Sequence, residues 1–333
     1  MSKESKNLEQ KNLTELSWDA EQAKQRLAIS RFTAGTVRRE VYKHNLKIFE
    51  AWKYVAPSGK VIKLPGTRQE LLDATRVYRE MVSAVEVPVR YQTTRTGCTN
   101  EDCLVVAKNL IDQGLNPAIL NMANAYQACG EYNKGDGSQE PSLCRASTLS
   151  PTLYQYYNKL WAKKAGGALR EPKGYPMDIR FGGIYSPNVT VFRDNEKTGF
   201  ALREEPYTTS IISMGALNFN PKITPNNMEY RAENDGFTPE GEEVMRDKIR
   251  TLYRIALLHG HDSLVLGAFG CGAFHLQPEL ISTLFKETLE ETEFKGKFHT
   301  IAFALLEGSA GPRRKVEEEG KLASFYQQFG KLR

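Results

Sequence analysis

The stretch Ser263-Leu-Val-Leu-Gly-Ala-Phe-Gly-Cys-Gly-Ala-Phe274 says most about the fold of this chain. An apolar strand leads into a segment with three glycines, and Gln277-Pro278 then opens a helix. Glycines let backbone N–H groups approach an anion closely, and a helix N-terminus adds further donors. The stretch predicts a phosphate-binding turn, or equally a tight turn packed with aromatic rings. It is neither a Walker loop nor a GxGxxG dinucleotide motif.

Strands and helices alternate on both sides of this stretch. Such alternation predicts an α/β sheet covered by helices on both faces. We expect a mobile polar tail over residues 1–16, a helical extension over 17–87 and the α/β domain over 88–333. In the extension, Thr36 is expected to cap a helix, and Val77 and Tyr78 to continue one. The expected strands are 89–95, 116–122, 182–193, 208–214, 263–268 and 298–305, and the expected helices are 101–113, 139–163, 239–260, 277–292 and 316–329.

Composition narrows the class of protein. The chain has 333 residues with 40% hydrophobic and 26% charged residues, which are globular proportions. The longest nearly apolar stretch, residues 263–274, is far shorter than the about 20 residues that span a membrane. The polar opening Met1-Ser2-Lys3-Glu4 has no apolar core of a secretory signal peptide. We therefore expect a cytoplasmic protein that does not bind membranes.

Charge and cysteine usage bear on partners and cofactors. The net charge of 45 − 40 = +5 suits an anionic ligand but is not the dense basic stripe of a nucleic-acid binder. The five cysteines form no CxxC pair and no zinc spacing, which is typical of reduced thiols. His259 and His261 fall at a predicted helix end, where histidine favours the dipole. We expect a monomer with no metal, no cofactor and no sequence-specific contact with nucleic acid.

A second group of candidates follows the predicted strand 116–122. Asn121 and Asn124 stand where that strand ends, and ligands of open α/β sheets bind beyond the carboxyl ends of strands. Asn124 either hydrogen-bonds a sugar hydroxyl or forms an Asx turn. Just before a predicted helix that runs from Cys103 to Ile111, Glu101 and Asp102 either complement the helix dipole or accept a hydrogen bond from an adenine amino group.

The segment 126–141 holds carboxylates among glycines. Glu131, Asp136 and Glu140 suggest acid chemistry at a glycosidic carbon, or they are solvated loop charges. Arg145 is either a surface charge or holds this segment by hydrogen bonds.

These residues stand within motifs that together resemble the microbial-type poly(ADP-ribose) glycohydrolases, which are macrodomain proteins with an N-terminal helical extension. The resemblance covers roughly residues 36–330. The motifs, in the order of the family, are Thr99-Asn-Glu-Asp102, Asn121-Met-Ala-Asn124-Ala, Gln139-Glu-Pro-Ser-Leu-Cys-Arg-Ala-Ser-Thr148, Ile184-Tyr-Ser-Pro-Asn-Val-Thr-Val-Phe-Arg-Asp194, Glu205-Pro-Tyr-Thr-Thr and His259-Gly-His-Asp-Ser-Leu-Val-Leu-Gly-Ala-Phe-Gly-Cys-Gly-Ala-Phe274.

The resemblance implies a macrodomain fold that binds ADP-ribose, with ADP-ribosylated protein as the partner. Asn124, with Asn121 nearby, would face the ribose, and Asp102 with Glu101 would read the adenine. A bulky residue at Gly270 should then block the anion, and Phe274 should pack against a ribose or the adenine. The residues implied to hold the diphosphate are Gly267, Phe269, Gly270, Cys271, Gly272, Ala273 and Phe274.

The segment 126–141 departs from the family pattern. The family has three glycines followed by Gln-Glu-Glu, whereas this chain has Cys129-Gly130-Glu131 and Gln139-Glu140-Pro141. The second glutamate of the family motif is its general acid, and Pro141 has no ionisable group. The first interpretation is therefore an ADP-ribosyl hydrolase with another acid, in the order Glu140, Asp136, Glu131. The second is a module that binds ADP-ribose without cleaving it. The third is a related hydrolase of NAD metabolites or a structural partner.

Overall fold

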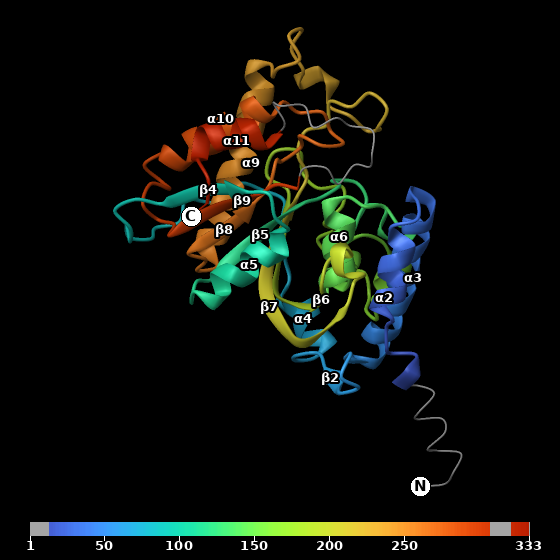
Figure 1. Cartoon of the computed structure of the whole chain (residues 1–333). Helices are drawn as coiled ribbons and strands as arrows, with labels where there is room; N and C mark the ends of the chain where they lie inside the picture. The colour runs from blue at the N-terminus through green and yellow to red at the C-terminus, as the bar shows by residue number, and fades with distance from the viewer. Residues whose placement is uncertain (1–12, 307–320, 333) are drawn as a thin grey trace, which may run out of the picture. The chain divides into compact units, whose positions relative to one another are not determined.

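A seven-stranded sheet is the largest β element of the computed structural model, which describes residues 13–306 and 321–332 (Figure 1). Its strands are β3 Arg76–Tyr78, β4 Arg95–Thr99, β5 Pro117–Met122, β6 Gly183–Arg193, β7 Leu202–Met214, β8 Ser263–Leu266 and β9 Thr300–Ala304. They lie in the order β3-β6-β7-β5-β8-β9-β4. Neighbouring strands from β7 to β4 pair in parallel, whereas β3 pairs antiparallel with β6. The sheet is therefore mixed, and its parallel strands agree with the predicted α/β class.

The chain forms two compact units, each made of separate segments. The first unit comprises Met1–Thr75, Gln127–Lys173 and Ser186–Thr208, and the second comprises Arg76–Tyr126, Gly174–Tyr185 and Thr209–Arg333. β6 and β7 each have residues in both units. The linear boundary expected near residue 87 stays a prediction.

The second unit is built on the parallel strands. Its strands β5 and β8 are almost wholly buried, as strands covered on both faces should be. Thr238 caps α9, whose first residue is a proline, and α10 also begins at a proline, where the missing N–H costs nothing. α5 contacts β5, β8 and β9, while α11 contacts β4 and α10. The helices of this unit are α5 Cys103–Asp112, α9 Pro239–Leu258, α10 Pro278–Glu290 and α11 Lys321–Phe329, with the 3-10 turn η3 Met228–Tyr230.

The first unit is mainly helical and also contains a small hairpin. Ser30 caps α3 by accepting from the N–H of Thr33. The cap expected at Thr36 was wrong, because that hydroxyl lies inside α3 and donates to the carbonyl of Phe32. The elements of this unit are α2 Ala20–Leu27, α3 Arg31–Ala51, β1 Lys53–Val55, β2 Val61–Lys63, α4 Arg68–Ala74, η1 Tyr132–Lys134, α6 Gln139–Ala146, α7 Leu149–Tyr154, α8 Lys159–Lys164 and η2 Glu196–Thr198.

Several expected boundaries needed correction. The single helix expected over 139–163 is three helices. Ser147 is extended and bridges to Val191, and Asn158 caps a new helix by accepting from the N–H of Trp161. The strand expected over 89–95 begins only at Arg95, where pairing with β9 starts. Val77 and Tyr78 lie in β3 rather than in a helix, since they pair with β6.

The ends of the chain also differ from expectation. Leu16 is buried in the first unit, and its carbonyl accepts from the N–H of Val55. The last residue of the polar tail expected over 1–16 is therefore packed against the rest of the unit. Residues 1–12, and residues 316–320 of the last expected helix, lie outside the described residues.

Candidate functional site

The second unit gathers three of the predicted groups at one edge of its sheet. β4, β5 and β8 run in the same direction, so the residues that follow them lie beyond the same edge. Glu101 and Asp102 follow β4, Asn124 follows β5, and residues 267–274 follow β8. A Cβ built on Gly267 would lie 3.1 Å from the sulfur of Met122, so β5 and β8 end close together.

The segment 267–274 presents backbone donors. Gly272 and Ala273 are exposed, and Phe274 is half-buried. Within residues 13–306 and 321–332, the N–H groups of Gly272, Ala273 and Phe274 donate no hydrogen bond. The carbonyl of Ala273 accepts from Asn220 at 2.8 Å, which fixes the segment. Three successive free N–H groups form a cradle suited to an anion.

The two phenylalanines of this segment differ in position. Phe269 is 1% exposed and lies in the hydrophobic core, so its ring is not available for stacking on a ligand. Phe274 packs against the same core but is only partly buried. Cys271 is buried, and its N–H donates to Ala268.

Gly270 is required by packing within the protein. Its φ is +77°, and a Cβ there would lie 2.4 Å from Leu276 and 2.9 Å from Ala216. A bulky residue at Gly270 would therefore disturb the turn itself. The expectation that such a variant would only block the anion needs correction.

The polar candidates of this edge have partners in the protein. Asn124 accepts from the N–H of Tyr126 at 2.9 Å, which is an Asx turn. Asn121 is fully buried and donates to the hydroxyl of Ser213. Asp102 caps α5 at the N–H of Leu104.

Glu101 also stands beside this cap, since its carboxylate accepts from the N–H of Asp102. Glu101 and Asp102 both keep partly exposed surface. The helix cap thus explains why Asp102, with Glu101 beside it, stands before α5. Their contact with adenine stays a prediction.

In the first unit, Glu140 supports the turn of the altered motif. Cys129 has a φ of +64°, and the following Gly130 has +52°. The buried carboxylate of Glu140 accepts from the N–H of Cys129 at 3.1 Å. Gln127 closes the turn by donating to the carbonyl of Gly130 at 2.7 Å. A non-glycine residue in the left-handed region is strained, so these bonds stabilise an unfavourable backbone.

Gly130 lies against two residues of α6. A Cβ built on Gly130 would stand 3.4 Å from Oε2 of Glu140 and 3.5 Å from Cγ of Pro141. The carboxylate and the proline ring therefore lie side by side at this glycine.

The other two carboxylates of this segment are more exposed. Glu131 pairs with Lys134 at 2.8 Å, and its side chain is 41% exposed. Asp136 accepts from the N–H of Ser138 at 2.7 Å and also bonds its hydroxyl.

A buried polar network holds the segment onto α3. Arg145 is fully buried and donates to the carbonyl of Asp136 at 2.5 Å, which is the loop-holding alternative of the two considered. Asn45 of α3 donates to the hydroxyl of Tyr132 and to the carbonyl of Arg145. Arg193 in turn donates to Asn45.

Burial lowers the pKa of Arg145 to about 10 and that of Arg193 to about 9. The sequence did not single out Asn45 or Arg193. Only the polar Asn45 in an otherwise apolar stripe of a helix could have signalled such a role.

The histidines expected at the end of α9 bind tyrosines. His259 accepts or donates at the hydroxyl of Tyr78, 2.7 Å away, and its ring stacks on Tyr185. His261 bonds the hydroxyl of Tyr185 at 3.0 Å. The described residues contain no group of three or more His, Cys, Asp or Glu side chains that could hold a metal ion.

Comparisons with known proteins agree with the motifs. Residues 43–194 match the family model described as the catalytic domain of microbial-type PARG. The structure is similar to poly(ADP-ribose) glycohydrolase from Thermomonospora curvata, with a TM-score of 0.66 and 27% identity over 88% of this chain and 99% of that chain. The chain is thus similar to the microbial-type poly(ADP-ribose) glycohydrolases. A comparison with curated proteins found no match.

Two further solved structures of such glycohydrolases show what they bind. The Thermomonospora curvata protein has been solved with the inhibitor ADP-HPD, again at a TM-score of 0.66 and 27% identity over 88% of this chain and 99% of that chain. The glycohydrolase from Deinococcus radiodurans has been solved with ADP-ribose, at a TM-score of 0.57 and 25% identity over 80% of this chain and 98% of that chain.

The fold shared with these glycohydrolases is macrodomain-like, as the resemblance implied. Among residues 13–306 and 321–332, no helix is long and apolar enough to cross a membrane.

Proposed function

We propose that this protein binds ADP-ribose through its second unit and hydrolyses the bond between ADP-ribose and a modified protein or polymer. The ADP-ribose and ADP-HPD complexes of its relatives support this ligand. The free N–H groups of Gly272, Ala273 and Phe274 are the observation that supports the binding step. Such donors stabilise a diphosphate without any side-chain charge.

We infer that Glu140 supplies the acid in place of the glutamate missing at Pro141. Its carboxylate lies beside the proline ring at Gly130, so a shift of one residue along α6 still brings a carboxyl group to the same glycine. Asp136 is the second choice and Glu131 the third, because both are exposed and already paired on the surface.

The proposed reaction needs one carboxyl group and one water. Glu140 in its protonated form would give a proton to the leaving oxygen or nitrogen as the glycosidic bond breaks, and water would add to the oxocarbenium-like carbon. The water then loses a proton to the carboxylate, which restores the acid. The expected products are ADP-ribose and the unmodified side chain or shortened polymer.

One observation favours the second function, a module that binds ADP-ribose without cleaving it. Glu140 is 3% exposed and already accepts a hydrogen bond from the N–H of Cys129. A carboxylate used to hold a strained turn is less free to exchange protons with a substrate.

Turnover separates the two functions. The protein should release free ADP-ribose from at least one of four substrates, namely arginine-, serine- or glutamate-linked ADP-ribose or the polymer. Glu140→Gln should lower the rate by about 10²–10⁴-fold, the usual effect of losing a general acid, and keep ADP-ribose affinity. Asp136→Asn and Glu131→Gln test the second and third choices, and a loss of rate in one of them instead would assign the acid there. If the unaltered protein binds ADP-ribose but cleaves none of the four, it is a binding module.

The binding step has its own test at Ala273. Because Ala273 is exposed and already carries a Cβ, a longer side chain there should leave the turn intact. Ala273→Glu should weaken ADP-ribose binding at least about ten-fold more than the neutral Ala273→Gln, since only the first repels a diphosphate. Equal affinities of the two variants in calorimetry would rule out a diphosphate beside residues 272–274.

A further inference from the structure

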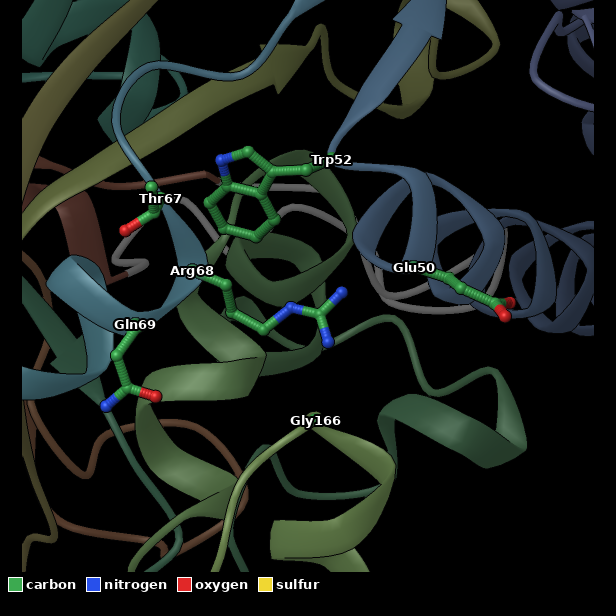
Figure 2. A pocket seen from close by; sticks show the side chains of 6 residues that line it. All are labelled: Glu50, Trp52, Thr67, Arg68, Gln69 and Gly166. Atoms are coloured by element: carbon green, nitrogen blue, oxygen red, sulfur yellow. The ribbon is translucent and has the colours of Figure 1, made fainter.

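A pocket lies in the first unit at the C-terminal end of α3. It has a volume of about 450 Å³ and is lined by Glu50, Trp52, Thr67, Arg68, Gln69 and Gly166 (Figure 2). None of the residues that line this pocket belongs to the segment 126–141. The pocket is therefore distinct from the segment that carries Glu140.

The centre of this pocket is the guanidinium of Arg68. Its carbon lies 5.7 Å from the centre of the Trp52 ring. On another side it lies against Gly166, where a Cβ would come within 1.8 Å of Nη1. The indole N–H of Trp52 donates to the carbonyl of Gly66 at 2.9 Å, which fixes the ring. Arg68 is thus held in place by packing.

Arg68 makes no ion pair in the described part of the chain. Its Nε is buried without a hydrogen-bond acceptor, and no hydrogen bond or ion pair is made by either Nη atom. Glu50 is the acid that acts on it from a distance, and partial burial lowers the pKa of Arg68. A fixed guanidinium with free donors is a good binding group for an oxyanion, because two parallel N–H groups match two oxygens.

The surrounding segment is basic. Residues 159–173 contain five basic residues and one acidic residue, and Gly166 of this segment lines the pocket. Arg170 of the same segment is engaged by Asp73 of α4. The lining holds one basic residue, Arg68, and one acidic residue, Glu50, so the preference for a doubly charged oxyanion over a carboxylate comes from the basic segment beside the pocket.

We propose that this pocket binds a phosphate group, either as the free ion or as a phosphate ester. Arg68 is the binding residue, and Trp52 provides an apolar wall that an ester with a flat ring can contact. Thr67 and Gln69 line the same pocket, where the Thr67 hydroxyl caps α4 at the N–H of Glu70 and the Gln69 amide donates to Asp73. This inference does not depend on the proposed hydrolase function.

The indole signal of Trp52 offers a local test. The chain has three tryptophans, so its indole N–H signals in a ¹⁵N-correlated NMR spectrum are few and Trp52→Phe assigns the relevant one. Inorganic phosphate, AMP and, for comparison, acetate are titrated at constant ionic strength into the full chain. We expect a saturable shift of the Trp52 signal with phosphate or AMP and none with acetate. A lower midpoint concentration for AMP than for phosphate would identify the phosphate ester as the preferred ligand. Equal midpoint concentrations would identify the free ion as sufficient.

Variants connect the shift to Arg68. Arg68→Gln should raise the ligand concentration at the midpoint at least about ten-fold, as expected for the loss of a charged hydrogen-bond donor. The midpoint of Arg68→Lys should lie between those of Arg68→Gln and the unaltered protein. Gly166→Ala should have the same effect as Arg68→Gln, because the new methyl group displaces the guanidinium. Lys43→Gln removes one exposed charge from α3 outside the pocket and should change nothing.

Circular dichroism checks that each variant is folded. The proposal is overturned if phosphate and AMP give no saturable shift, if acetate acts equally well, or if Arg68→Gln and Arg68→Lys both keep the unaltered midpoint. The ADP-ribose site is excluded as the source of the signal if the shift persists in Ala273→Glu.

Discussion

At the scale of single residues, Phe269 and Phe274 should respond to substitution in opposite ways. Phe269→Ala should lower the free energy of unfolding by about 3–5 kcal/mol, the usual cost of removing a buried ring, because Phe269 is 1% exposed. Phe274→Ala should weaken ADP-ribose binding about five-fold, since ring stacking contributes on the order of 1 kcal/mol. Urea unfolding and calorimetry measure the two effects.

Each of these two variants is the control for the other. Both variants remove one phenyl ring from the same turn, so a general disturbance would change affinity and stability together. If Phe274→Ala retains its affinity for ADP-ribose while losing stability, Phe274 is a core residue only.

Substitution of Gly135 by alanine should destabilise the protein more than the same substitution at a glycine with the same backbone angle elsewhere. Gly59 and Gly135 both have a φ of +86°, but only Gly135 faces an atom, with its added Cβ 2.3 Å from the carbonyl oxygen of Gly35. Gly59→Ala should cost about 1 kcal/mol in backbone strain. Gly135→Ala should cost about 1–3 kcal/mol more, because the loop must move off α3. Thermal unfolding of both variants checks the difference.

Equal melting temperatures for the two alanine variants would show that the contact between Gly35 and Gly135 is loose. In that case Gly135 would serve only to adopt its left-handed backbone.

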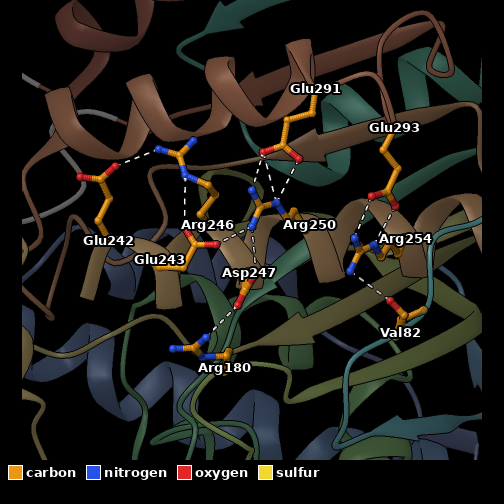
Figure 3. A network of polar contacts seen from close by, with 10 residues as sticks. All are labelled: Val82, Arg180, Glu242, Glu243, Arg246, Asp247, Arg250, Arg254, Glu291 and Glu293. Carbon is orange, nitrogen blue, oxygen red and sulfur yellow. Dashed lines mark hydrogen bonds and ion pairs between the residues drawn. The ribbon is translucent and has the colours of Figure 1, made fainter. Parts of the chain in front are cut away.

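At the scale of elements, a row of arginines joins α9 to the end of α10. Arg246, Arg250 and Arg254 are four residues apart and so share one face of α9 (Figure 3). Arg250 binds Glu291 through both Nε and Nη2, and it also pairs with Asp247 at 3.0 Å. These partners raise the pKa of Arg250.

Arg250→Gln should lower the free energy of unfolding by about 1–2 kcal/mol, because the side chain is only 23% exposed and has several charged partners. Arg231→Gln is the control, since Arg231 makes a single pair with the mostly exposed Asp235, and it should cost under about 0.5 kcal/mol. Added salt should reduce the stability of the unaltered protein more than that of Arg250→Gln. An equal salt response in urea unfolding would mean that the network contributes no net stability.

The elements that the sequence predicted correctly are those with a strong local pattern. α9, α10, β5 and β8 agree with the expected ranges because apolar spacing and terminal prolines mark them. The breaks near Ser147 and Asn158 could not be predicted, since they depend on a bridge to Val191 and on a cap. The start of β4 depends on its pairing with β9, which lies about 200 residues away.

The candidate site was predictable to the same degree. The glycines after β8 and the asparagines after β5 stand out in sequence because strand ends and turn residues are local signals. The bond from Cys129 to Glu140 and the buried network of Asn45, Arg145 and Arg193 were not predictable. They join segments up to 148 positions apart in the chain.

At the scale of the whole molecule, two histidines should make stability depend on pH. Burial lowers the pKa of His44 to about 3 and that of His259 to about 4, both from 6.5. Below pH 6.5 the unfolded chain therefore binds protons that the folded chain does not, so the folded state loses stability as the pH falls. The loss continues until the pH reaches the folded pKa values. For His44 it should be no more than about 2 kcal/mol at pH 5.

Urea unfolding at neutral pH and near pH 5 measures this loss. His44→Asn removes the titration but can still accept a hydrogen bond from Arg193, so its stability should change less between the two pH values. An unchanged pH dependence in His44→Asn would assign the loss to other groups.

The division of the chain into interleaved segments has a consequence for synthesis on the ribosome. The first unit needs residues up to Thr208, yet the segment Arg76–Tyr126 of the second unit emerges before it is complete. The nascent second unit then waits for Thr209–Arg333, which carries β8 and β9. While it waits, the apolar strand β5 has no neighbour β8, so this interval is when the chain is most exposed to aggregation and chaperones.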